Sequence, residues 1–94
     1  MSKKDTAELQ AIDDQIRELE EIKRGYEARA LRHIDQAQRM QFKDQYYLEA
    51  KRHFELADEN QQAADEVQRE IDRLKARRRQ ILDKNGAGDG FEDL

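Results

Sequence analysis

Residues 34–54, IDQAQRMQFKDQYYLEAKRHF, decide the fold, because their apolar positions mirror one another about a point between Lys43 and Asp44. Pairs whose residue numbers sum to 87 run outward from this point: Met40 with Tyr47, Ala37 with Ala50, Ala30 with Ala57, Tyr26 with Gln61, and Ile16 with Ile71. Such a mirror is expected when a chain folds back on itself as two antiparallel helices. The sequence therefore predicts an architecture and a register.

Apolar residues recur at steps of three and four, which is the spacing of one face of a helix. They predict a first helix over about 5–41 and a second over about 46–84, and the apolar stripe expected in the seam includes Ile34 on the first helix and Tyr47 and Phe54 on the second. Ser2 and Asp5 form a start signal for the first helix, Asp44 is a candidate cap of the second, and Asn85-Gly86 is a terminating pair. We expect residues 1–84 to form one hairpin and residues 85–94 to form a flexible, glycine-rich, acidic tail.

Composition limits the shape of the molecule. The chain has 94 residues, of which 36% are apolar and 43% are charged, and it contains no proline. Such a chain cannot enclose a thick globular core, but it suits long helices. We expect an all-α fold, a long coiled-coil-like antiparallel hairpin without strands.

The charge distribution favours the same pairing. Residues 5–21 carry seven acids and one base, whereas residues 73–84 carry six bases and one acid. Antiparallel folding sets these blocks side by side, and a parallel self-pairing would place like charges together.

One alternative to the hairpin stays open, because residues 41–45 contain neither glycine nor proline. A continuous helix about 120 Å long could pair with a second copy in the same register. We favour the hairpin, since short connections between antiparallel helices are common.

The predicted seam between the helices is narrow. The mirror places Lys23 opposite Ala64 and Leu9 opposite Arg78, so we expect the seam to be polar at its middle and at its open end. A single hairpin that buries so little apolar surface is only marginally stable. We therefore expect a homodimer or other homo-oligomer, with two hairpins packed as a four-helix bundle.

Candidate partner-binding residues gather near the turn and in the tail. Aromatic and leucine side chains cluster toward the turn, and the tail ends in a small apolar and acidic tip that could act as a tethered peptide ligand. The alternatives are a thickened core that closes the turn and a tail that is simply disordered. The expected contact residues are Phe42, Tyr46, Tyr47, Leu48, Phe54, Phe91 and Leu94.

Other chemistry has little support in the sequence. His33 and His53 reach the same level across the seam, with Glu49 one turn before His53, which suggests a metal site. The basic run from Arg73 to Lys84 suggests nucleic-acid binding, but the acidic segment 5–21 should neutralise it. No phosphate loop, nucleophile elbow or catalytic triad is present. We expect no catalytic residue, no cofactor and no bound metal.

The function expected from these features is a non-catalytic protein-protein interaction module that acts by helix-face packing. It would serve as a scaffold, an adaptor or a small chaperone or co-chaperone. The alternatives are a nucleic-acid-associated helical protein and a metal-binding helical bundle. No apolar run is long enough to span a bilayer, the first residues lack the apolar stretch of a signal peptide, and cysteine is absent. We therefore expect a cytoplasmic protein without a membrane partner.

Overall fold

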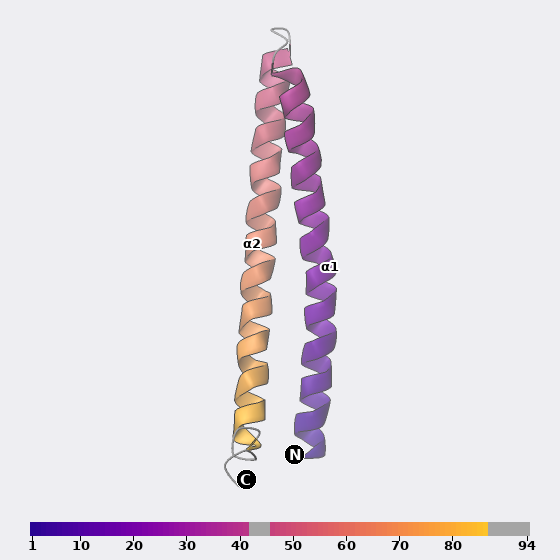
Figure 1. Ribbon diagram of the computed structural model, residues 1–94, viewed down its shortest axis with the longest axis vertical. Coiled ribbons are helices and arrows are strands. Elements are labelled where there is room, and N and C mark those ends of the chain that lie inside the picture. The colour runs from indigo at the N-terminus through magenta and orange to yellow at the C-terminus, as the bar shows by residue number, and fades with distance from the viewer. Residues whose placement is uncertain (42–45, 87–94) are drawn as a thin grey trace.

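The computed structural model describes residues 1–41 and 46–86. It contains two α-helices, α1 (Lys3–Met40) and α2 (Tyr47–Lys84), which lie antiparallel in a rod of 70 × 23 × 14 Å (Figure 1). The predicted all-α hairpin is confirmed, and no strand occurs among the described residues. Because α1 ends at Met40, the chain forms a hairpin rather than one continuous helix.

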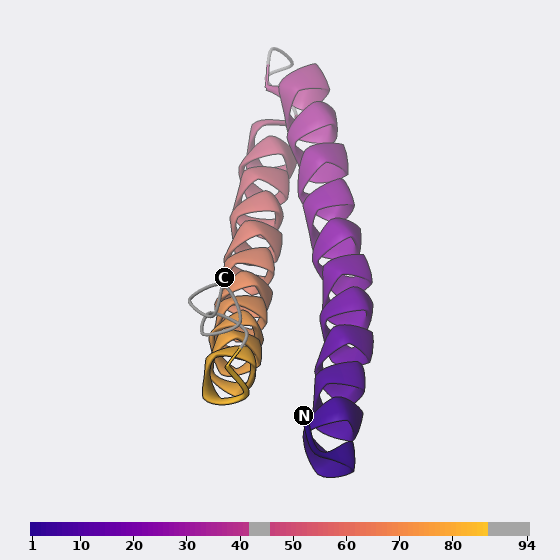
Figure 2. The ribbon, with the colours of Figure 1, turned by 60° about the horizontal axis from the view of Figure 1, so that its bottom comes forward.

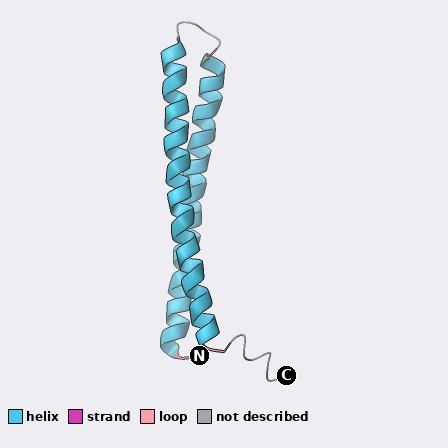
Figure 3. Ribbon diagram, turned by 90° about the vertical axis from the view of Figure 1, so that its left-hand side faces the viewer, coloured by secondary structure: helices cyan, strands magenta, loops and turns pink. Residues whose placement is uncertain are grey.

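The two helices wind around each other along their whole length. They lie side by side at the end that carries the termini in Figure 1, and near the connection in Figure 3, which is turned by 90°. Figure 2 shows the same pair with the termini brought forward. Buried positions explain the winding, because Ala50, Ala57, Ala64 and Ile71 follow one another at seven-residue intervals. A strict seven-residue repeat keeps the seam in contact only if the helices supercoil.

The helix ends follow local capping chemistry. Ser2 is the N-cap of α1, and its hydroxyl oxygen accepts a hydrogen bond from the backbone N–H of Asp5 at 3.0 Å, as predicted. The predicted cap Asp44 lies outside the described residues, and the N-cap position of α2 is Tyr46. At the other end, the backbone N–H of Asn85 donates to the carbonyl of Ile81, and Gly86 adopts a φ of 74°. This left-handed conformation favours glycine and ends α2 where the sequence predicts.

Cross-helix polar contacts define the register. They join Asp5 with Lys84 and Asn85, Glu8 with Arg77, Asp13 with Arg78, Lys23 with Gln68, Arg29 with Asn60, and His33 with His53. The sums of these residue numbers range from 85 to 91. The predicted sum of 87 lies inside this range and within about one helical turn of every contact.

The core differs between the two ends of the rod. In the open half, residues 1–23 and 65–86, four buried isoleucines make a cluster, with further apolar side chains packed against it: Ile12, Ile16, Ile71 and Ile81, joined by Leu9, Leu19, Val67 and Leu74. In the turn half, residues 24–41 and 46–64, every buried residue that the structure describes is an alanine: Ala30, Ala37, Ala50, Ala57 and Ala64. The large-residue core therefore lies near the termini.

This distribution corrects the expected polar open end. Leu9 packs against the isoleucine cluster, and the Arg78 guanidinium extends to Asp13, with 2.9 Å between Nε and Oδ1. A long arginine side chain can extend past an apolar seam to a neighbouring carboxylate. The open end is therefore apolar inside and charged at its edge.

Opposite charges neutralise each other at the open end. Arg77 makes a two-pronged contact with Glu8, at 2.9 and 3.2 Å. Asp5 is 7% exposed, receives a hydrogen bond from the Asn85 amide at 3.0 Å, and lies 3.6 Å from the Lys84 amine. The Asn85 hydrogen bond lowers the pKa of Asp5, and the Arg77 hydrogen bond lowers the pKa of Glu8. Both carboxylates are therefore held in their charged form, and they tie the start of α1 to the end of α2.

These two carboxylates should make the open end sensitive to acid. Their ordinary pKa values are 3.8 and 4.5, and both values are lower in the folded chain. Their contribution to stability is then complete above about pH 5 and is lost as the pH falls through the folded pKa values. We expect the double variant Asp5→Asn with Glu8→Gln to melt at a lower temperature than the wild type at pH 7, with a smaller further loss on acidification. This expectation would be contradicted if the melting temperatures of the wild type and the double variant fell by the same amount between pH 6 and pH 2.

Candidate protein interaction surface

Large apolar side chains that the seam does not bury gather in the turn half. Six large apolar residues are exposed among those described, and four of them lie there: Leu31, Tyr47, Leu48 and Phe54, with exposed fractions of 67%, 64%, 75% and 40%. The alanine seam explains their position, because small side chains let the helices approach closely and leave no room for larger ones between them. The turn half therefore presents its apolar bulk to the outside.

Phe54 stands between two shallow grooves on one face of the hairpin. The groove nearer the turn has a volume of about 510 Å³ and is lined by Gln41, Tyr47, Ala50, Lys51, Phe54, Glu55 and Asp58. The other groove, of about 270 Å³, is lined by Ala30, Ile34, Phe54, Ala57, Asp58 and Gln61. Both grooves have small alanine floors and include Phe54 and Asp58. We name this strip the turn-half face and define it by Ile34, Gln41, Tyr47, Phe54 and Gln61.

The sequence-predicted contact residues divide between this face and the rest of the chain. Tyr47 and Phe54 belong to the turn-half face, Leu48 is exposed close to it, and Tyr46 is half-buried. Phe42, Phe91 and Leu94 lie outside the described residues. Ile34 was missed as a contact residue, because its four-residue spacing from Ala30 placed it in the predicted seam. Tyr47 and Phe54 were also expected in the seam, and both lie beside it.

The two histidines meet as expected, and they directly precede Ile34 and Phe54 of the turn-half face. The Nδ1 atoms of His33 and His53 are 2.9 Å apart, so one ring donates a hydrogen bond and the other accepts it. The ring centroids are 5.2 Å apart with an angle of 29° between the planes. Glu49 is exposed, and no group of three or more metal-ligating side chains occurs within residues 1–41 and 46–86. The pair therefore acts as a polar layer between alanine layers.

The basic end of α2 is largely paired with acids. Four of its six bases make ion pairs: Arg73 with Glu70, Arg77 with Glu8, Arg78 with Asp13, and Lys84 with Asp5. Lys75 and Arg79 are exposed and have no ion pair with the residues that the structure describes. A surface that binds nucleic acid needs several cations free to contact phosphates. The arrangement therefore gives little support to the nucleic-acid alternative.

Another hollow lies on α1 near the middle of the rod. It is lined by Glu18, Glu21, Ile22, Gly25, Tyr26 and Arg29, and the Arg29 guanidinium lies over the Tyr26 ring at 4.8 Å from its centroid. Arg29 also donates to Asn60 across the seam at 3.3 Å. Arg29 therefore links this hollow to α2.

Neither described helix contains a segment that is long and apolar enough to cross a bilayer. Comparison with known proteins adds no relative: no family model matches the chain, and no curated protein or solved structure shows significant similarity to it. The function is therefore argued from the geometry of the turn-half face.

Proposed function

We propose that this protein is a non-catalytic interaction module, acting as a scaffold, adaptor or small chaperone in the cytoplasm, and that it binds protein through the turn-half face. The observation that carries the proposal is the exposure of Phe54 between two alanine-floored grooves. An aromatic side chain flanked by grooves is typical of the anchors that dominate protein interfaces. The open half then supplies stability, and the turn half supplies binding.

The face has the dimensions and polarity expected for helix packing. Tyr47, Phe54 and Gln61 follow one another at seven-residue intervals on α2, so they form a ridge along the rod. The alanines beside this ridge leave space for the side chains of a partner helix. Lys51, Glu55 and Asp58 give the groove a charged rim. An apolar centre with a polar rim is the usual anatomy of a specific interface.

Photo-crosslinking tests this function directly. Benzoylphenylalanine at position 54 should form adducts with a protein, identified by mass spectrometry, whereas the same residue at position 22 should not. Ile22 is a matched control, because it is 48% exposed on the same rod but lies away from the face. Unlabelled wild-type protein should compete for the adduct, and Phe54→Glu should compete about 30-fold less well, since loss of an anchor costs about 2 kcal/mol or more. Equal competition by the two proteins would contradict the proposed function.

A further inference from the structure

We propose that the turn-half face binds a second copy of this chain, with a twofold axis along the length of the rod and both turns at the same end. The assignment uses the surface of the proposed function and therefore rests on it. In this arrangement α1 of each copy lies over α2 of the other. The result is a four-helix bundle whose interface is self-complementary, as a twofold contact requires.

The register of the hairpin determines which residues meet. Cross-helix contacts join residue numbers that sum to between 85 and 91, so residues that sum to about 88 lie at one level. A twofold axis along the rod preserves this level. Ile34 then lies opposite Phe54 of the second copy, and Gln41 lies opposite Tyr47, since both pairs sum to 88. The exposed aromatic side chains of each copy are thereby covered by the face of the other.

Charged rows along the outer edges of the face match in the same way. Asp58 lines both grooves, and Asp65 and Asp72 continue its row at seven-residue intervals along α2. Arg17 and Arg24 form a row on α1, three residues before Glu20 and Glu27, and three residues is the distance between neighbours on a helix surface. All four of these arginine and aspartate positions, 17, 24, 65 and 72, are exposed.

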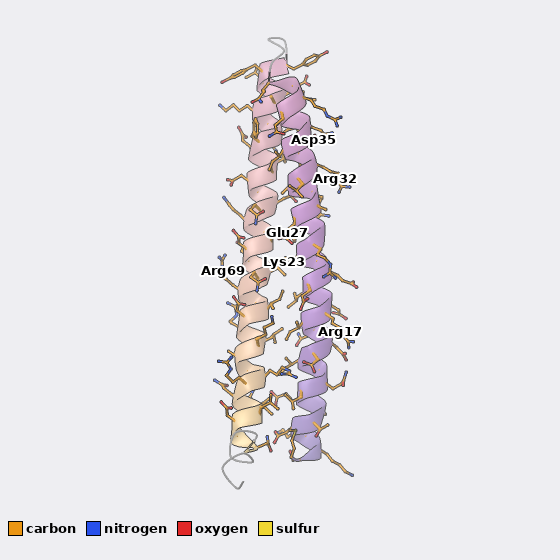
Figure 4. The ribbon with its side chains drawn as sticks, viewed as in Figure 1. Arg17, Lys23, Glu27, Arg32, Asp35 and Arg69 are labelled. Atoms are coloured by element: carbon orange, nitrogen blue, oxygen red, sulfur yellow. The ribbon has the colours of Figure 1, made fainter. Side chains whose placement is uncertain are left out.

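The two rows do not pair within one hairpin. Figure 4 shows Glu27 between the helices and Arg17 on the side of α1 turned away from α2. Arg17 pairs with Asp14 of its own helix, and Arg24 has no ion pair with a described residue. Asp65 and Asp72 accept side-chain hydrogen bonds from Gln61 and Gln68 of their own helix. In the dimer, Arg17 lies level with Asp72 of the second copy and Arg24 lies level with Asp65, because both pairs sum to 89.

The head-to-tail arrangement of the same two faces is unfavourable. It lays α1 on α1, so Arg17 of one copy meets Arg24 of the other at the middle of the helix that runs over Lys3–Met40. In this register facing residues of α1 sum to about 42, so Ile34 comes to the level of Glu8 and Phe54 comes to the level of Arg77, which pairs with Glu8. Like charges and desolvated ionic groups then oppose the contact.

The rod has enough surface for the proposed dimer. A standard interface takes about 800 Å² from each partner, which is roughly one-ninth of the 7272 Å² surface of this chain. One long face of the rod can supply this area.

A charge-swap experiment tests the partner and the orientation together. Two full-length variants are made, Arg17→Glu with Arg24→Glu, and Asp65→Arg with Asp72→Arg, and their masses are followed by sedimentation between 1 and about 200 μM. We expect the wild type to dimerise and each variant alone to dimerise at least tenfold more weakly, because every edge pair becomes like-charged. An equimolar mixture should recover a dissociation constant within about threefold of the wild type. Far-ultraviolet circular dichroism checks that each variant keeps its helices.

A spin-label measurement gives the orientation without altering the edges. The chain has no cysteine, so Gln80→Cys places one label per copy near the open end. The two labels should lie within about 30 Å in the proposed dimer, where facing helices are about 10 Å apart. In a head-to-tail dimer they would be about 45 Å apart or more, because residue 80 lies about 14 residues from the middle of α2 (Tyr47–Lys84) and each residue adds about 1.5 Å.

These results test the dimer separately from the proposed interaction function. A wild-type protein that stays monomeric at 200 μM, a mixture that does not recover, or labels about 45 Å or more apart would each overturn the assignment of a second copy in this orientation. The proposed function would survive these results if the position 54 crosslinker captures a different protein. A wild-type dimer that Phe54→Glu leaves intact would also overturn the assignment.

Discussion

Ile71→Ala should lower the free energy of unfolding by about 2–5 kcal/mol, the range found for deletion of buried isoleucine and leucine side chains. Ile71 is 1% exposed and belongs to the isoleucine cluster of the open half. Truncation removes three carbons from the only large-residue core among the described residues and leaves a cavity that two long helices cannot readily close. The loss should therefore be large compared with the total stability of a small domain, which is about 5–15 kcal/mol.

Ile22→Ala is the matched control for this loss. It makes the same chemical change on α1, where the side chain is 48% exposed, and we expect a cost below about 1 kcal/mol. Urea denaturation followed by circular dichroism gives both values. All samples need the same protein concentration, because self-association adds to the apparent stability. Equal losses for the two variants would show that the open half does not supply the core.

Ala64→Asp should cost about 3–5 kcal/mol, because it places an uncompensated carboxylate in the alanine seam. Ala64 is 0% exposed, and aspartate is too short to carry its charge out to water. The bulk of the new side chain also forces the helices apart where they approach closely. We expect little helical signal at 37 °C and dilute concentration.

Ala28→Asp separates burial from helix propensity. Ala28 is exposed on α1, so its replacement should cost only about 0.7 kcal/mol or less, the difference in propensity between the two residues. Thermal unfolding of both variants beside the wild type provides the comparison. A loss at position 64 as small as the loss at position 28 would mean that the alanine seam is open to water.

The two halves of the rod therefore have different roles. In the open half, isoleucines and cross-helix ion pairs hold the helices together. In the turn half, alanines keep the helices close and leave Phe54 and Tyr47 outside. A hairpin built in this way retains its shape while one end offers apolar surface to a partner. This division agrees with the separate outcomes expected for Ile71→Ala, which acts on stability, and Phe54→Glu, which acts on binding.

The sequence predicted the elements of the fold well and the exposure of individual residues less well. Steps of three and four residues identify a helix whatever surrounds it, so the predicted ends at 41 and 84 lie within one residue of Met40 and Lys84. The Ser2 cap could be predicted because it depends only on neighbouring residues. Ile34 and Phe54 were assigned to the seam because they belong to the apolar stripe. Residue spacing alone does not show which residues at the edge of such a stripe face the other helix and which face solvent.

By itself, the sequence determined that residues 5–41 and 46–84 are helical and that these segments pair antiparallel, whereas the end of α1 at Met40, which makes a hairpin of one chain, came from the structure. Helical periodicity is local, and opposite-signed charge blocks favour one direction over the whole length. Only the tertiary structure decided which half holds the large-residue core, that Arg78 leaves the seam for Asp13, and that Phe54 lies between two grooves. These outcomes depend on how closely the helices approach at each level, and that distance is set by side chains from both helices together.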